Sequence, residues 1–260
     1  MSFKPFDLSG KTVLITGGNG GIGLGMAEGV AQAGADVCIW GTNDDKNANA
    51  LAVLKEHGTK VAAKKCDVSD RGAVEKCFAE TLEEFGRVDG CFANAGAGAR
   101  GVPYHEMPDE DWERILGINL WGAHYVLQQA AGHMKARADD GDAFGRLVGT
   151  ASLAAVSGQA RGEHYAATKG AIVSMMKALA VEYARYNVTA HTILPGWIET
   201  AMTEQTFAWD KFAANVMPRI PMRRWGKPED FAAIAVYIMS DASQYHTAET
   251  FLIDGGYFVF

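Results

Sequence analysis

Cysteine is scarce in this sequence. Four cysteines occur among 260 residues, and none of them shows CxxC spacing. Three of the four lie within apolar stretches, so we expect reduced core residues of a cytosolic protein rather than a disulfide framework. The seven histidines show no HxxxH or HExxH spacing, and the sequence therefore predicts no metal ion held by the protein. The cysteines are Cys38, Cys66, Cys77 and Cys91.

An excess of basic charge and a long apolar run are also missing. The formal net charge is −7, which argues against nucleic acid as a partner. The longest uncharged apolar run, Phe231 to Met239, has nine residues, whereas a helix needs about 20 to span a bilayer. The first residues, MSFKPFDLSGK, contain no apolar signal-peptide core. We therefore expect a cytoplasmic protein with no membrane partner.

Apolar segments of strand length alternate with amphipathic segments of helix length. Several of the strands are apolar on both faces, which is typical of a parallel sheet covered by helices on both sides. We predict a single doubly wound, Rossmann-type α/β domain over residues 1–260, with about seven parallel strands. The strands are expected at 12–18, 36–40, 60–68, 88–96, 145–152, 187–196 and 249–256, and the main helices at 22–33, 47–57, 71–85, 109–136 and 164–184.

A glycine-rich turn, TGGNGGIG, joins the first strand to the first helix at residues 16–23. Glycine permits positive φ and close backbone approach, and a helix N-terminus offers free N–H groups and partial positive charge to a pyrophosphate. The alternative is a tight turn with no ligand. The first strand-to-helix turn of an alternating chain is the expected place for a dinucleotide.

The turn has the form TGxxxGIG, which resembles the short-chain dehydrogenase/reductase family. Further segments resemble that family in the right order: CDVSD, ANAG, INLWG, YAATK, PGWIET and PMRRWGKPED. Ala93 departs from the family's NNAG. The resemblance extends from about Leu8 to Gly256 and is greatest to 3-oxoacyl-carrier-protein reductases and to sugar-alcohol and secondary-alcohol dehydrogenases. It implies these dinucleotide-binding residues: Gly17, Asn19, Gly20, Gly21, Ile22, Gly23, Thr42, Asp67, Val68, Asn94, Ala95, Gly96, Tyr165, Lys169, Pro195, Gly196, Ile198 and Thr200.

The predicted chemistry is hydride transfer between a secondary alcohol or ketone and the dinucleotide. Tyr165 and Lys169 lie one helical turn apart, and a nearby ammonium is expected to lower the phenol pKa so that Tyr165 can act as general acid and base. Ser152 would hydrogen-bond the substrate oxygen. The resemblance implies that Asn119 holds a water between Lys169 and solvent. Without this context, Tyr165 and Lys169 could be a chance surface pair.

The identity of the dinucleotide rests on the end of the second strand, WGTNDDK. NAD-preferring relatives place an acid at the position of Gly41. NADP-preferring relatives place a cation at Thr42 or at Gly20, the residue just before the second glycine of the TGxxxG turn. The chain has neither. A 2′-phosphate without a placed cation is costly, so the sequence favours NAD over NADP, with Lys46 as a weak counter-ion.

A long aromatic segment at about residues 196–228 follows the sixth strand and is predicted to be the substrate loop. Trp197, Phe207 and Trp209, with Phe212, would cover an apolar ketone or alcohol, or would instead form a small satellite core. The basic residues Arg100, His105 and Arg161 could meet an acidic substrate, or could simply be exposed. His164 and His191 are predicted to be structural.

Small residues on the two longest helices and the apolar C-terminal tail GGYFVF predict a homotetramer, because relatives pair through these elements. A tail folded onto its own core would also explain the tail. Three rival functions remain: a 3-oxoacyl-carrier-protein reductase, a non-catalytic dinucleotide-binding regulator, and a structural protein that would leave the glycine turn unexplained.

Overall fold

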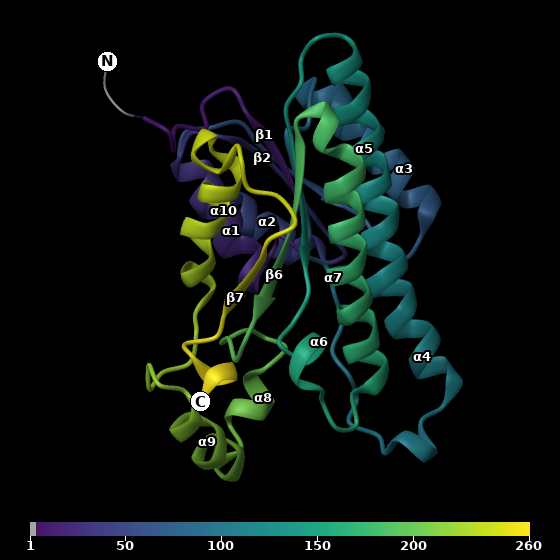
Figure 1. Cartoon of the computed structure of the whole chain (residues 1–260), viewed down its shortest axis with the longest axis vertical. Coiled ribbons are helices and arrows are strands. Elements are labelled where there is room, and N and C mark those ends of the chain that lie inside the picture. Colours follow the sequence, from purple (N-terminus) through teal and green to yellow (C-terminus); the bar gives the residue numbers. More distant parts are fainter. Residues whose placement is uncertain (1–3) are drawn as a thin grey trace.

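A computed structural model describes residues 4–260 of the chain. Within these residues, seven parallel strands form one sheet in the order β3-β2-β1-β4-β5-β6-β7. Helices cover both faces of the sheet (Figure 1). The predicted fold class, a doubly wound α/β sheet of about seven strands, is confirmed.

The strands and helices alternate over nearly the whole chain. The strands are β1 Thr12–Thr16, β2 Asp36–Gly41, β3 Val61–Lys65, β4 Gly90–Ala93, β5 Gly145–Thr150, β6 Val188–Pro195 and β7 Thr250–Ile253. The helices are α1 Gly21–Gln32, α2 Asp44–Lys55, α3 Arg71–Phe85, α4 Asp109–Ile115, α5 Gly122–Asp139, α6 Ala154–Ser157, α7 Glu163–Tyr183, α8 Glu204–Phe207, α9 Asp210–Val216 and α10 Ala232–Met239. A π-helical segment, η2, covers Leu116–Trp121, and 3-10 turns occupy Tyr104–Glu106, Ala184–Tyr186, Met217–Arg219, Pro228–Phe231, Asp241–Ser243 and Tyr257–Val259.

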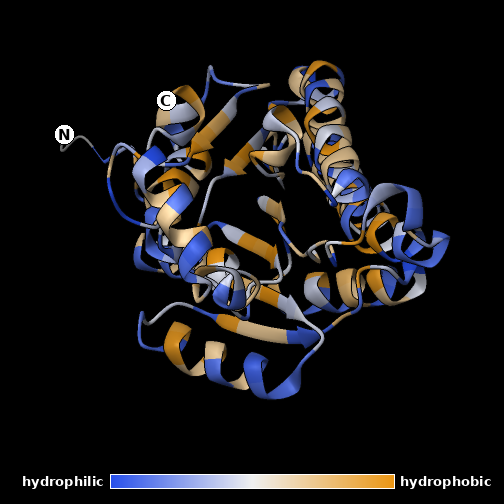
Figure 2. Ribbon diagram, turned by 90° about the horizontal axis from the view of Figure 1, so that it is seen from below, coloured by the Kyte–Doolittle hydropathy of each residue, from blue (hydrophilic) through white to orange (hydrophobic). Residues whose placement is uncertain are grey.

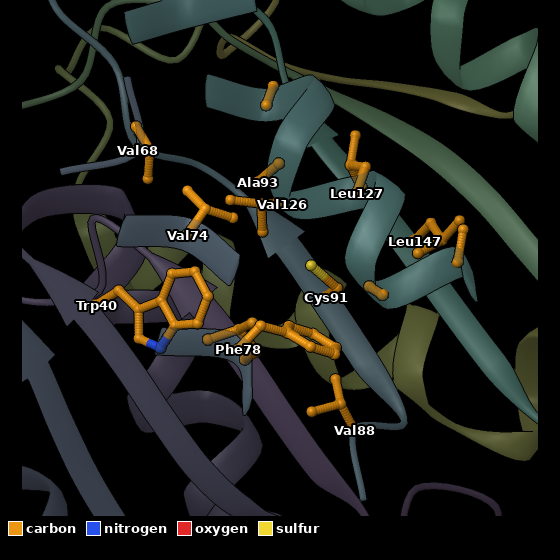
Figure 3. Packing of buried hydrophobic residues seen from close by; sticks show 14 of the residues in the cluster. Trp40, Val68, Val74, Phe78, Val88, Cys91, Ala93, Val126, Leu127 and Leu147 are labelled. Atoms are coloured by element: carbon orange, nitrogen blue, oxygen red, sulfur yellow. The ribbon is translucent and has the colours of Figure 1, made fainter. Parts of the chain in front are cut away.

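One hydrophobic cluster lies between the sheet and helices α3, α5 and α7. Trp40 of β2 and Phe78 of α3 lie near Cys91 of β4 (Figure 3). The indole N–H of Trp40 donates to Oγ1 of Thr81 at 3.2 Å, so this buried polar group is satisfied. Helices α3, α5 and α7 therefore pack directly against this face of the sheet.

A second cluster lies on the opposite face, under α1, α2 and α10. Helix α1 packs closely on the segment that leads into α10: a Cβ on Gly25 would lie 2.1 Å from the carbonyl oxygen of Pro228, and one on Gly29 would lie 2.7 Å from Cα of Ala232. Figure 2 shows the strands as mainly hydrophobic and the surrounding helices as alternating between hydrophobic and hydrophilic residues. The two clusters hold the sheet between two helical layers.

Residues 109–139 are continuously helical, three residues beyond the predicted end at Ala136, but not uniformly α-helical. The π segment η2 separates α4 from α5, and π-helical turns often occur at functional sites. Over residues 4–260, no helix combines the length and the hydrophobicity needed to span a bilayer. The same residues contain no group of three His, Cys, Asp or Glu side chains placed to hold a metal ion.

Candidate active site

A hollow of about 350 Å³ opens where β1, β4, β5 and β6 end. Ligands of open parallel sheets bind at these carboxyl ends, and the volume falls in the range of small-molecule sites. Its lining includes two lysines, Lys46 and Lys169, and no carboxylate. The lining residues are Gly17, Asn19, Gly20, Gly21, Ile22, Lys46, Asn94, Ala95, Gly96, Thr150, Ala151, Ser152, Tyr165, Lys169, Pro195, Gly196, Ile198, Thr200, Ala201, Met202 and Thr203.

The glycine turn forms one side of this hollow. Gly17 and Gly21 have positive φ of 64° and 51°, a region that glycine enters without steric cost. Helix α1 begins at Gly21, and its N-cap residue Gly20 makes no side-chain capping bond. The first N–H groups of α1 therefore face the hollow without a side chain competing for them, which suits an anionic pyrophosphate.

Asn94 ties the end of β4 to the end of β1. Its Nδ2 donates to the carbonyl oxygen of Thr16 at 3.0 Å, and the backbone N–H groups of Asn94 and Ala95 both donate to Oγ1 of Thr16 at 3.0 Å. A Cβ on Gly23 would lie 2.2 Å from the carbonyl oxygen of Gly17 and 2.5 Å from Nδ2 of Asn94. Gly23 is thus packed behind the turn rather than exposed on the wall of the hollow.

Asn119 lies in η2 and is almost completely buried. Its Oδ1 accepts the N–H of Ala97 at 2.8 Å, and its Nδ2 donates to the carbonyl oxygen of Ala97 at 3.0 Å. A Cβ on Gly96 would lie 3.3 Å from Oδ1 of Asn119 and 3.5 Å from Nζ of Lys169. Asn119 therefore does not line the hollow itself but lies behind Gly96, next to Lys169.

Tyr165 and Lys169 extend from α7 to the same wall as Ser152, which follows β5. Nζ of Lys169 donates to the carbonyl oxygen of Thr150 at 2.8 Å and lies 5.6 Å from the centre of the Tyr165 ring. Burial lowers the pKa of Lys169 to about 8. The predicted convergence of phenol, ammonium and serine hydroxyl is present.

The prediction that Lys169 lowers the pKa of Tyr165 is wrong for the protein without a bound dinucleotide. Burial raises the pKa of the Tyr165 phenol, and only its hydrogen bond with Ser152 acts in the opposite direction. The physical reason is desolvation, which disfavours the charged phenolate of Tyr165 and likewise lowers the pKa of Lys169.

Several predicted residues lie away from the hollow. Thr42 and Asp67 are exposed. Asp67 accepts hydrogen bonds from the N–H and the hydroxyl of Ser69. Val68 packs against α5, because a Cβ on Gly122 would lie 2.7 Å from Cγ2 of Val68. Their proposed contacts with the nucleotide stay predictions. The wall also includes residues that the sequence pattern did not single out: Thr150, Ala151, Ala201, Met202 and Thr203. Thr150 and Ala151 could have been found from the end of the fifth strand.

The end of β2 has no room for a side chain at Gly41. A Cβ there would lie 2.1 Å from Nδ2 of Asn19 and 2.5 Å from Oδ1 of Asn47, two atoms that are hydrogen-bonded to each other at 2.7 Å. Asp44, beyond this point, pairs with Lys65 at 2.6 Å. Lys46, in contrast, lies on the wall of the hollow and has no ion-pair partner within residues 4–260. The residues present therefore fit a dinucleotide and its negative charge.

The predicted substrate aromatics form a packed group. The Trp197 ring lies 4.9 Å from that of Phe212 and 6.4 Å from that of Phe207, and Phe207 stacks on Trp225 at 4.1 Å. Trp209 is 60% exposed and does not belong to this group. This geometry favours the alternative in which these aromatics form a small satellite core of the loop, rather than an open cover over the substrate. Trp225 was not assigned to this group from the sequence, because its neighbours Arg223, Arg224 and Lys227 are basic.

The basic residues and histidines considered from the sequence have separate places. Arg100 pairs with Asp111 at 3.0 Å, whereas His105 and Arg161 are exposed. His164 and His191 are fully buried, and burial lowers the pKa of both, to about 4 for His191. None of these five residues lines the hollow as the structure describes it for residues 4–260.

Comparisons with known proteins identify the family of this chain. A family model described as enoyl-(acyl carrier protein) reductase matches residues 17–258. A 3-oxoacyl-[acyl-carrier-protein] reductase of Chlamydia pneumoniae is 36% identical over 250 residues, covering 96% of this chain and 97% of that protein. An L-rhamnose 1-dehydrogenase (NAD(P)(+)) of Sphingomonas sp. (strain SKA58) is 34% identical over 256 residues, covering 97% and 98%. A gluconate 5-dehydrogenase of Burkholderia cenocepacia, crystallised with NADP and tartrate, superimposes with a TM-score of 0.92 at 30% identity, covering 99% and 98%.

The chain therefore belongs to the short-chain dehydrogenase/reductase family. The resemblance read from the glycine turn, YAATK and the intervening motifs is confirmed. The family's members are NAD(P)-dependent oxidoreductases, and this chain is an enzyme of that class.

Proposed function

We propose that this enzyme interconverts a small secondary alcohol and the corresponding ketone, with Tyr165 transferring the proton. The observation that carries the proposal is the convergence of Ser152, Tyr165 and Lys169 on one wall of the hollow whose other side is the glycine turn. The nicotinamide, when bound, supplies or accepts the hydride. Positioning of the reacting groups and electrostatics would then supply most of the rate enhancement.

Each side chain has a distinct role in this proposal. Ser152, hydrogen-bonded to the phenol, would hold the substrate oxygen beside Tyr165. The raised pKa of Tyr165 keeps the phenol protonated at neutral pH, so it is ready to donate to a carbonyl oxygen in ketone reduction. Lys169 would hold the nicotinamide ribose, and Asn119 would place a water behind Gly96. The dinucleotide would be bound by the lining residues between Gly17 and Thr200. Gly23, Thr42, Asp67 and Val68 would support them.

We propose that NAD and NADP both bind. The preference for NAD follows from the missing cation at Gly20 and Thr42. Lys46 on the wall supplies a positive charge that a 2′-phosphate could use, and no acid stands at Gly41 to repel that phosphate. The rhamnose dehydrogenase relative is named for both dinucleotides.

The substrate in this proposal is a neutral alcohol or ketone, including sugar alcohols. Beyond Lys46 and Lys169, no basic side chain lines the hollow as it is formed by the described residues, and Arg100 is engaged with Asp111. The second candidate, a 3-oxoacyl-carrier-protein reductase, is favoured by the relative at 36% identity. The proposed assembly is a cytoplasmic homotetramer, supported by the exposed Val259 and Phe260 of the C-terminal tail.

The test is a panel of secondary alcohols, ketones and a 3-oxoacyl thioester, followed at the NADH absorbance with both dinucleotides. Replacing Tyr165 by Phe removes only the phenolic oxygen. We expect a loss of turnover of about 10²–10⁴-fold, the usual contribution of a general acid–base group, with dinucleotide affinity within about twofold. Turnover that survives in Tyr165→Phe contradicts the proposal. A wild-type chain that binds dinucleotide and turns over nothing on the panel would instead be a non-catalytic regulator.

A further inference from the structure

The backbone that follows β4 borders the hollow and is fastened at three points. We refer to residues Ala97–Arg100 as the β4 loop. Asn119 binds both the N–H and the carbonyl oxygen of Ala97. A Cβ on Gly98 would lie 3.5 Å from Cγ and Sδ of Met202, which lines the hollow. The position of the β4 loop thus affects both the proposed relay residue Asn119 and the wall at Met202.

The other two fastenings are arginines. Nη2 of Arg114 donates to the carbonyl oxygen of Gly98 at 3.3 Å. Nη1 of Arg100 pairs with Oδ1 of Asp111 at 3.0 Å, and the same oxygen lies 4.0 Å from Nε of Arg114. One carboxylate in the first turn of α4 therefore lies between the two guanidinium groups that hold the loop.

The burial of this carboxylate distinguishes it from a surface ion pair. The side chain of Asp111 is 5% exposed, whereas that of Arg100 is 65% exposed. An exposed pair contributes little, but a buried carboxylate is costly unless it is paired, and removing one partner strands the other. Asp109 and Glu110, in the same turn, are exposed. Only Asp111 of these three acids is directed inward, toward the loop.

Helix α4 also supports the start of α7. The ring of Trp112, next to Asp111, lies 5.8 Å from that of His164, which directly precedes Tyr165 and is 1% exposed. The first turn of α4 therefore contacts, on one side, the loop that binds Asn119 and, on the other, the turn that carries the phenol.

We propose that Asp111 is a positioning residue for the active site. Through Arg100 and Arg114 it fixes the β4 loop, and the loop in turn fixes the side-chain amide of Asn119 and the wall facing Met202. Asp111 touches no reacting atom. The inference rests on the proposed function for its effect on turnover, but its effect on the loop is independent of any substrate.

The test compares Asp111→Asn, which keeps the shape and removes the charge, with Asp109→Asn as the matched control in the same turn. Hydrogen–deuterium exchange of the peptide around residues 95–102 is measured first. We expect exchange at the Ala97 amide, whose N–H donates to Oδ1 of Asn119, to be at least about tenfold faster in Asp111→Asn, since amide protection follows the local opening equilibrium, and unchanged in Asp109→Asn. Arg100→Ala, at an exposed side chain that the fold can lose, must accelerate exchange at the same amide.

Turnover and binding are then measured on the same variants. We expect kcat/KM of Asp111→Asn to fall about tenfold, with dinucleotide affinity within about twofold of wild type, and the Arg100→Ala and Asp111→Asn losses to be non-additive because the pair acts as a unit. Unchanged exchange in the loop overturns the proposal, and so does exchange that accelerates over the whole chain. If the wild-type chain turns over no substrate, the proposed function fails while the exchange result still decides the role of Asp111.

Discussion

Gly41 closes β2 at a point where the backbone meets the side chains of Asn19 and Asn47. The hydrogen bond between those two amides fills the space that a side chain at 41 would need. An acid that binds the ribose diol therefore has no place there, and the charged side chains on the wall are those of Lys46 and Lys169. At the scale of single residues, we expect the choice between dinucleotides to depend on Lys46.

The Lys46→Ala variant tests that dependence. We expect kcat/KM for NADP to fall about tenfold, because a charge-assisted contact to phosphate contributes roughly 1.5–3 kcal/mol when well formed and less when exposed. The value for NAD should stay within about twofold. Lys55→Ala, in the last turn of the same helix, is the control. An equal loss with both dinucleotides would mean that Lys46 does not meet the 2′-phosphate.

At the scale of elements, the sequence was most informative where both ends of a helix carry a recognisable signal. Helix α3 spans the predicted residues 71–85, because Asp70 accepts from the N–H groups of Gly72 and Ala73 and Gly86 ends the helix in the left-handed conformation. Helix α2 begins three residues earlier than predicted, since Asn43 caps it. Each of these ends follows from local chemistry.

Other elements depend on contacts that a single sequence does not contain. The π segment η2 brings Asn119 to Ala97, and nothing in the residues LGINLW distinguishes it from ordinary α-helix. The short helices α8 and α9 form around an aromatic group that Trp225 completes from a distant segment. The four proposed catalytic residues could be found from their motifs, whereas the wall facing the substrate could not.

The aromatic group in the loop after β6 gives a prediction at this scale. Phe207→Ala should lower the free energy of unfolding by about 2 kcal/mol, below the roughly 3–5 kcal/mol of a fully buried phenylalanine because Phe207 is half-buried. Trp209→Ala should change the free energy of unfolding by less than about 0.5 kcal/mol, as is usual for surface positions. Urea denaturation measures both values. KM for apolar ketones should stay within about twofold in each variant; a large rise in KM with little loss of stability would restore the interpretation of these residues as a cover over the substrate.

At the scale of the whole molecule, the doubly wound parallel sheet and the family could be predicted from the alternation of elements and the ordered motifs. The assembly could not, because it depends on which exposed surfaces meet. Val181 on α7 and Val259 in the C-terminal tail are 84% and 81% exposed, and the proposed homotetramer would cover such apolar groups.

We expect light scattering at micromolar concentration to give about four times the chain mass of 27.9 kDa, the value for the proposed homotetramer. Dilution into the nanomolar range serves as a control for weak association. A species of one chain mass at micromolar concentration would show that the exposed apolar residues are not an interface.

The last strand of the sheet has a consequence for how the protein is made. Gly196, on the wall of the hollow, donates its N–H to the carbonyl oxygen of Ile253 at 2.9 Å and packs against Asp254. The glycine turn at residues 16–23 leaves the ribosome early, but the opposite wall gains its support only when β7 has emerged. A nascent chain can therefore form most of its sheet while it still has no finished pocket, and cofactor capture should wait until synthesis is nearly complete.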